Sequence, residues 1–99
     1  MELKQLNYFM VCAKTGSFSS AAEVLFTTQS SVSKVIKSLE DELGTKLFER
    51  YARGIRLTET GRKIYPYAVR ISESFQEISL ICEQYSGTDN SKENEIPGV

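Results

Sequence analysis

The sequence predicts a mainly α-helical fold of three short helices, a two-stranded hairpin and one long helix. Three observations support this class. Apolar residues recur at spacings of three and four through residues 3–14, 29–43 and 64–82, the period of one helix face. Between the last two segments, residues 45–49 and 54–57 have the composition of two short strands around a glycine-containing turn. The 99 residues leave room for one compact domain and little more.

The first helix is expected over residues 3–14, and Gly16 can adopt the left-handed conformation that ends it. Its apolar stripe consists of Leu3, Leu6, Phe9, Met10 and Ala13.

A second, short helix follows, and its start is open between two signals. Ser17 or Ser19 can cap it, and a capping box from Ser20 to Glu23 is a competing start. The polar segment 27–29 is expected to end this helix.

The third helix is predicted over residues 29–43, with Thr28 as its N-cap and Gly44 just beyond its end. Its buried stripe is predicted to be Val32, Val35, Ile36, Leu39 and Leu43. The opposite face carries Gln29, Ser30, Ser33, Lys34 and Lys37. Short polar side chains let a helix N-terminus approach phosphates and base edges closely. The acidic run 40–42 is predicted to be a solvated face that keeps the end of this helix away from phosphates.

The predicted hairpin joins strands 45–49 and 54–57 through residues 50–54, with Gly54 free to adopt a positive φ. An isolated hairpin is only marginally stable, so this one is expected to pack against the helices through Leu47, Phe48, Ile55 or Leu57. Its tip is expected to project three guanidinium groups, those of Arg50, Arg53 and Arg56.

The fourth helix is predicted over residues 59–87, capped by Thr58, with a bend or a later regular start caused by Pro66. Its apolar seam consists of Ile64, Ala68, Ile71, Phe75, Ile78 and Cys82. A helix of about 40 Å, at ~1.5 Å per residue, is too long to bury that seam on a domain of this size. We therefore expect a second copy of the chain to cover it. Gly87 is expected to end the helix, and residues 88–99 to form a flexible tail or hinge.

Composition excludes several classes of function. The chain contains no histidine, and its two cysteines lie far apart, so it offers neither a His-based catalytic group nor the start of a zinc site. We predict no enzymatic activity, no metal and no cofactor, with Cys12 and Cys82 as free thiols. No membrane span or secretory signal is present, which predicts a cytoplasmic location.

The net charge of −1 hides an uneven distribution. Residues 1–57 carry eight basic and six acidic side chains, and residues 58–99 carry four basic and seven acidic ones. A locally basic surface on a nearly neutral chain is typical of a selective nucleic-acid binder.

Three helices and a basic hairpin, with a helix-turn-helix at about 18–37 and a wing at about 45–57, form a winged helix-turn-helix. Over residues 1 to about 86 the sequence resembles the N-terminal DNA-binding domain of LysR-type transcriptional regulators. The motifs that carry the resemblance are Gly16-Ser17-Phe18-Ser19-x-Ala21-Ala22-x-x-Leu25, Thr28-Gln29-Ser30-x-Val32-Ser33-Lys34-x-Ile36-x-x-Leu39-Glu40, Glu42-Leu43-Gly44-x-x-Leu47-Phe48-Glu49-Arg50 and Arg53-Gly54-x-x-Leu57-Thr58-x-x-Gly61.

The resemblance implies a homodimer, formed through the long helix, that binds an interrupted palindrome in double-stranded DNA. It implies a recognition helix in the major groove and a wing on the minor groove or backbone, in a domain spanning residues 1–58. Regulators of this family also carry an effector-sensing domain that assembles tetramers, and these 99 residues do not contain it.

Position by position, the resemblance assigns Gln29 to a base edge, Ser33 to a phosphate or base, and Arg50 and Arg53 to the wing. Lys34 stands where arginine is more common and Ser30 where proline is usual. Thr28, Lys37 and Arg56 complete the predicted DNA-binding set.

A second hypothesis treats the chain as an interaction module. Its long helix would pair with full-length regulator subunits and form inactive mixed dimers, and the recognition residues would then be dispensable.

Overall fold

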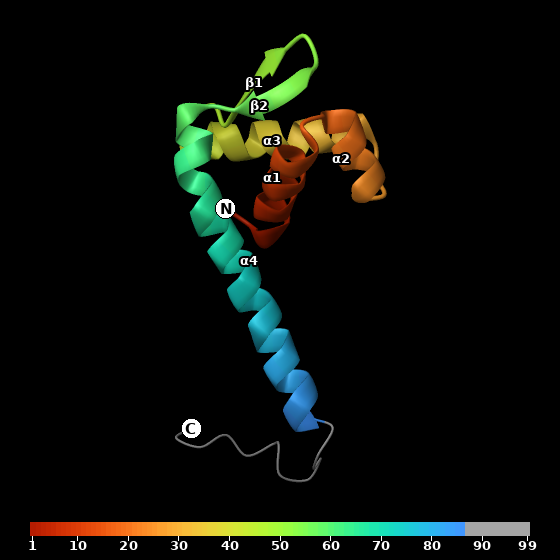
Figure 1. Cartoon of the computed structure of the whole chain (residues 1–99), viewed down its shortest axis with the longest axis vertical. Helices are drawn as coiled ribbons and strands as arrows, with labels where there is room; N and C mark the ends of the chain where they lie inside the picture. Colours follow the sequence, from red (N-terminus) through yellow and green to blue (C-terminus); the bar gives the residue numbers. More distant parts are fainter. Residues whose placement is uncertain (87–99) are drawn as a thin grey trace.

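The computed structural model describes residues 1–86. In chain order these form α1 (Leu3–Thr15), α2 (Phe18–Val24), α3 (Gln29–Leu43), β1 (Phe48–Tyr51), β2 (Gly54–Leu57) and α4 (Glu59–Ser86). The first three helices and the hairpin form a head, and α4 runs past it and extends far beyond (Figure 1). The predicted mainly helical class is confirmed. The predicted helix end at Gly87 and the predicted tail at 88–99 lie outside the described residues.

The turn between α1 and α2 is built by a glycine and a serine. Gly16 has φ 71°, and its N–H donates to the Cys12 carbonyl at 2.9 Å, which closes α1. The hydroxyl of Ser17 then accepts from the N–H of Ser20 at 3.1 Å, so α2 begins at Phe18. The competing start at Ser20 is not used.

Helix α2 ends earlier than predicted. The polar segment 27–29 does not break it, because the helix already stops at Val24. Phe26 has φ 55° and turns the chain, and the N–H of Thr27 donates back to the Ala22 carbonyl at 3.0 Å. The helix-turn-helix therefore turns on an aromatic residue in the left-handed region.

Helix α3 has the predicted bounds. The Thr28 hydroxyl accepts from the N–H of Ser31 at 3.1 Å, and the N–H of Gly44 donates to the Glu40 carbonyl at 2.8 Å. Two members of the predicted buried stripe lie elsewhere. Val35 is half-buried, and Leu43, the last residue of α3, is 37% exposed.

The acidic run at the end of α3 is only partly solvated, so that prediction was wrong for Glu40. This residue is 9% exposed, and its carboxylate accepts from the N–H groups of Leu47 at 2.8 Å and Phe48 at 3.3 Å. Asp41 and Glu42 are exposed as predicted.

The wing, defined as β1 and β2, is antiparallel, and its first strand is displaced from the predicted 45–49: it starts at Phe48 and continues to Tyr51, so residues 50–51 belong to the strand and not to the turn. Residues 45–47 are not in β1, because the N–H of Leu47 is bonded to Glu40 before the strands pair. Phe48 pairs with Leu57, and Tyr51 pairs with Gly54. The turn at 52–53 places only Arg53 at the tip.

The wing is docked on the turn between α1 and α2. The N–H of Ile55 donates to the Gly16 carbonyl at 3.0 Å, and a Cβ on Gly54 would lie 2.2 Å from that same oxygen. Gly54 therefore permits a close approach of two backbones that any larger residue would block.

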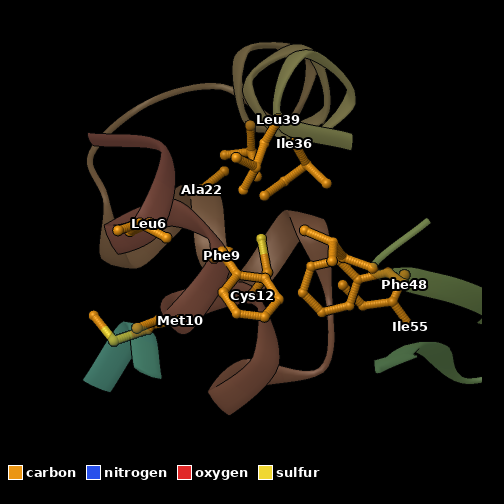
Figure 2. Close-up of a cluster of buried hydrophobic side chains, with 13 residues drawn as sticks. Leu6, Phe9, Met10, Cys12, Ala22, Ile36, Leu39, Phe48 and Ile55 are labelled. Atoms are coloured by element: carbon orange, nitrogen blue, oxygen red, sulfur yellow. The ribbon is translucent and has the colours of Figure 1, made fainter. Parts of the chain in front are cut away.

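The core lies where α1 crosses the other elements (Figure 2). Phe9 is fully buried, and its ring centroid lies 5.5 Å from that of Phe48 and 6.1 Å from that of Tyr65. Rings from α1, the wing and α4 thus meet at one point. The remaining core residues are Leu6, Met10, Cys12, Ala21, Ala22, Val32, Ile36, Leu39, Leu47, Ile55 and Ala68.

Helix α4 starts at Glu59 and contains Pro66 within its length, so the later start is not observed. Thr58 caps it as predicted, its hydroxyl accepting from the N–H of Gly61 at 3.0 Å. In the described part of the chain, no helix combines the length and apolar character needed to cross a membrane.

Candidate nucleic-acid interface

The polar side of α3 forms a continuous surface, which we call the recognition face. Its members line one shallow hollow, and four of them are exposed while Ser33 is half-buried. They are Gln29, Ser30, Ser33, Lys34 and Lys37. The structure therefore brings together all five side chains that the sequence assigned to this surface.

Thr28 shapes the N-terminal end of the recognition face. Its hydroxyl lies 3.0 Å from the hydroxyl of Ser31 and accepts from the N–H of the same residue. The first-turn N–H groups of an α-helix lack helical partners and carry the positive end of the helix dipole. This end of α3 is consequently suited to a phosphate group.

Lys37 forms an ion pair with Asp41 one turn later. The Nζ lies 3.4 Å from Oδ1, and both side chains are about two-thirds exposed. Such exposed pairs contribute little free energy, so Lys37 can exchange Asp41 for a phosphate.

The three wing arginines occupy different places, which corrects the prediction that all three project from the tip. Only Arg53 lies at the turn, where it is exposed. Arg50 lies on β1, with its guanidinium 5.2 Å from the ring centroid of Phe18. Arg56 lies on β2, with Nε 3.0 Å from a carboxylate oxygen of Glu49 and the guanidinium over the Tyr51 ring.

A groove separates α3 from the wing, and it contains a cation that the sequence analysis did not select. Lys46 lines this groove together with Ser33, Lys37 and Arg50. The side chain of Lys46 is 75% exposed, and its Nζ lies 3.8 Å from a Glu40 oxygen. The basic excess of residues 1–57 pointed to this half of the chain, but only the fold places Lys46 beside α3.

The predicted seam of α4 divides into two parts. Ala68 is 1% exposed and Ile64 is half-buried, and both pack into the head of their own chain. Ile71, Phe75 and Ile78 are 40%, 53% and 61% exposed, and we call these three the apolar face of α4. Cys82 is exposed one turn further on.

The first helix adds residues that the seam prediction missed. A hollow of about 350 Å³ lies between α1 and α4, and Leu3, Leu6 and Met10 line it opposite Ile71 and Phe75. Leu3, a member of the predicted apolar stripe of α1, is 45% exposed. An apolar surface therefore spans two helices.

Cys12 is a free, buried thiol in the core. Burial raises the pKa of the Cys12 thiol to about 12, which leaves it protonated and inert. Within residues 1–86 no cluster of three or more metal-ligating side chains occurs.

Together, a tight turn between α2 and α3, an exposed recognition face and a basic hairpin define a winged helix-turn-helix domain. The chain belongs to the LysR family of bacterial regulatory helix-turn-helix proteins, whose family model matches residues 3–62.

Curated relatives are transcriptional regulators. The chain is 52% identical over 71 residues to an uncharacterized HTH-type transcriptional regulator of Azotobacter vinelandii, covering 72% of this chain and 49% of that protein. It is 38% identical to the RuBisCO operon transcriptional regulator of Allochromatium vinosum, covering 88% of this chain and 29% of that protein. The chain thus spans half or less of the length of these relatives. The prediction of a regulator rather than an enzyme is confirmed.

Solved structures of DNA-binding domains share this fold. The BenM DNA-binding domain in complex with benA site 1 DNA matches with a TM-score of 0.83 and 31% identity, covering 90% of this chain and 100% of that one. The CbnR DNA-binding domain in complex with DNA matches with a TM-score of 0.80 and 34% identity, covering 87% of this chain and 99% of that one. The chain is therefore a DNA-binding domain of the LysR family.

Proposed function

We propose that the chain binds a specific sequence in double-stranded DNA as a homodimer, with α3 in the major groove and the wing on the minor groove or backbone. The observation that carries this proposal is the recognition face. Short polar side chains and two lysines cover the exposed side of a helix whose N-terminus is also exposed. An α-helix fits the major groove, where each base pair presents a distinct pattern of donors and acceptors.

The side chains divide into two roles. Gln29 lies in the first turn of α3, and its amide can pair with an adenine edge through two hydrogen bonds. Lys34, Lys37 and Arg53 supply phosphate contacts that position the domain, and Arg53 reaches the minor groove from the tip of the wing. Ser30, Ser33 and Thr28 add short hydroxyl contacts, and Arg50 and Arg56 act from the strands.

The apolar face of α4 supports the homodimer. Three large side chains on one helix face are exposed, and they continue into the hollow beside α1. A second copy can insert its own α4 there and remove this surface from water, at roughly 25 cal/mol per Å² of apolar area buried. Two domains held by paired α4 helices would bind the two halves of an interrupted palindrome.

The curated relatives are longer than this domain. Because the chain spans half or less of its relatives, an effector-sensing domain and the tetramer it would assemble belong to the proposal for the whole protein. We infer that the protein acts in the cytoplasm, where it would associate with the nucleoid through its DNA contacts.

Selection from random DNA duplexes at two salt concentrations tests the proposal. An enriched interrupted palindrome is the expected result. Retention that depends on salt without any enriched sequence would contradict sequence-specific binding. No retention at either salt concentration would contradict DNA binding by this chain.

A second candidate is the interaction module that forms mixed dimers with longer subunits, and the exposed apolar face of α4 favours it. The two functions differ in what the recognition face contributes. If Gln29→Ala and Lys34→Ala leave the regulatory effect unchanged while Phe75→Glu abolishes it, the interaction module is the better description.

A further inference from the structure

We propose that Glu40 is a positioning residue for DNA binding: its carboxylate fixes the wing relative to the recognition helix, and it acts through Arg53. This inference rests on the proposed function and deepens it. Glu40 lies on the buried side of α3, and its side chain is 10% exposed. Its carboxylate therefore acts within the domain, at the junction of α3 and the wing.

The first argument is the cost of burying this group. A carboxylate removed from water is strongly unfavourable unless its oxygens have partners. Here Oε2 accepts from the N–H of Leu47 at 2.8 Å and from that of Phe48 at 3.3 Å, and Oε1 faces the Nζ of Lys46 at 3.8 Å. Both oxygens have partners: Oε2 has two backbone N–H donors at the entrance of the wing, and Oε1 has the charged Lys46.

The second argument is the place of those backbone groups. The Glu40 carbonyl accepts from the N–H groups of Gly44 and Thr45 and so closes α3. Its side chain then holds the next two core residues of the chain. One residue thus ends the recognition helix and sets the point from which β1 departs.

The third argument is that Glu40 joins α3 to the start of the wing through side-chain hydrogen bonds. Other hydrogen bonds of the hairpin reach other parts of the chain: Ile55 is bonded to Gly16 in the turn after α1, and Thr58 is bonded to Lys46 and Leu47. These keep the hairpin folded and attached to the head. The Glu40 bonds differ in that they start from the recognition helix itself, and α3 and Arg53 must contact one duplex together.

The sign of the charge separates this role from simple electrostatics. A carboxylate close to DNA repels phosphate, so removing its charge should strengthen binding. If Glu40 positions the wing, removing its acceptor oxygens should weaken binding instead. Comparing Glu40→Gln with Glu40→Leu isolates the acceptor, because both variants lose the charge and keep a side chain of similar size.

The test measures affinity of the full chain for its selected duplex over a series of salt concentrations. Glu40→Gln should bind within about twofold of the unmodified chain, because an amide oxygen can accept from both N–H groups. Glu40→Leu should bind about tenfold more weakly at 0.1 M salt, with a log–log slope smaller by ~0.9, as for one lost phosphate contact. If Glu40→Leu is unfolded by circular dichroism, Glu40→Ala replaces it, because water can then solvate the two amides.

A double-mutant cycle supplies the decisive comparison. In an Arg53→Ala background, Glu40→Leu should cause little further loss of affinity for the duplex, because the contact that Glu40 positions is already absent. An equal loss in both backgrounds, or no loss in either, would overturn the proposal. Glu42→Ala is the matched control, because it removes one exposed carboxylate from the same helix end and should not weaken binding.

Hydrogen exchange without DNA separates failure of this inference from failure of the proposed function. The amides of Leu47 and Phe48 should exchange faster in the acceptor-less variant while those of α1 stay protected. Unchanged protection of both amides would overturn the proposal. If the proposed function were wrong, the result would differ: the unmodified chain would select no DNA sequence from the random duplexes, whatever the exchange rates of these amides.

Discussion

Phe26 forms the turn between α2 and α3 in a backbone conformation that costs stability. It adopts φ 55° and exposes 96% of its surface at the turn between α2 and α3. The left-handed region is strained for a bulky residue, and asparagine and glycine adopt it more readily. The turn therefore forms because the helices on either side require it.

The first prediction concerns this strain. Phe26→Asn should raise the free energy of unfolding by about 1 kcal/mol, because asparagine tolerates the left-handed conformation. Urea denaturation measures the change. Val24→Asn is the control, because Val24 is also exposed but helical, and it should bring no gain. Equal or lower stability of Phe26→Asn would contradict the assignment of strain.

The burial of Cys12 makes the stability of the fold depend on pH. Its thiol has an ordinary pKa of 9.0, and burial in the core raises the folded-state pKa to about 12. The folded chain keeps the thiol protonated, so its contribution to stability is complete below pH 9 and is lost as the pH rises toward 12.

The second prediction follows from this loss of stability at high pH. The stability difference between the unmodified chain and Cys12→Ala should be constant from pH 6 to 8. It should then fall by up to ~1.4 kcal/mol per pH unit above pH 9. Denaturation of both proteins across this range measures it, and titration of tyrosine and lysine cancels in the comparison. A difference that stays constant up to pH 11 would show that the thiol is not desolvated.

At the scale of elements, α3 and the wing contribute in different ways to one interface. The recognition face offers amide and hydroxyl groups that can distinguish bases, and the wing offers a guanidinium at its tip. Base contacts determine specificity, whereas phosphate contacts determine position and general affinity.

The third prediction separates these contributions. Gln29→Ala should relax discrimination at one base pair by about 1–3 kcal/mol, because it removes a bidentate contact. Arg53→Ala should weaken binding to all sequences nearly uniformly. Affinities for a set of single-base operator variants measure both effects. An equal loss of specificity in the two proteins would contradict this division.

Helix α4 belongs partly to the head and partly to the proposed dimer. Its first turns are fixed by Thr58 and by Ala68, and its later turns expose the apolar face. The division falls where the helix leaves the head (Figure 1).

The fourth prediction tests the dimer. Phe75→Glu should produce a monomer, because it would bury an unpaired charge among apolar side chains. Sedimentation velocity measures the mass. Gln84→Glu is the control, because at about 100° per residue it lies on the opposite side of α4 and should leave the dimer intact. A Phe75→Glu dimer of unchanged stability would exclude this face as the interface.

At the scale of the whole molecule, the charge is distributed so that a chain of net charge −1 can still bind an anionic polymer. The cations Lys34, Lys37 and Arg53 lie on α3 and the tip of the wing, and Asp41 and Glu42 lie at the far end of α3. Net charge is therefore a poor guide to the DNA-binding surface.

The fifth prediction concerns salt. Three phosphate contacts per protomer, at ~0.9 each, should give a log–log slope of about −2.7 per protomer and about twice that for a dimer. Fluorescence anisotropy between 50 and 300 mM salt measures this. A slope near −1 would mean that the cations do not contact phosphates in the complex.

The sequence by itself determined the order of the elements, the caps at Thr28 and Thr58, and the polar side of α3. These are local properties, set by the spacing of apolar residues and by the hydrogen bonds of one turn. The sequence does not determine the start of α2, because Ser17, Ser19 and Ser20 offer similar local signals.

Only the tertiary structure decided what depends on distant contacts. Glu40 looked like one of three solvated acids, but it is buried because Leu47 and Phe48 present unpaired N–H groups to it. The three arginines of the hairpin lie at different places, because the pairing of the strands determines the neighbours of each one and proximity in sequence does not. The seam of α4 divided because the head covers Ala68 completely and leaves about half of Phe75 exposed. A periodic pattern specifies which face of a helix is apolar, and the packing of other elements specifies how much of that face is covered.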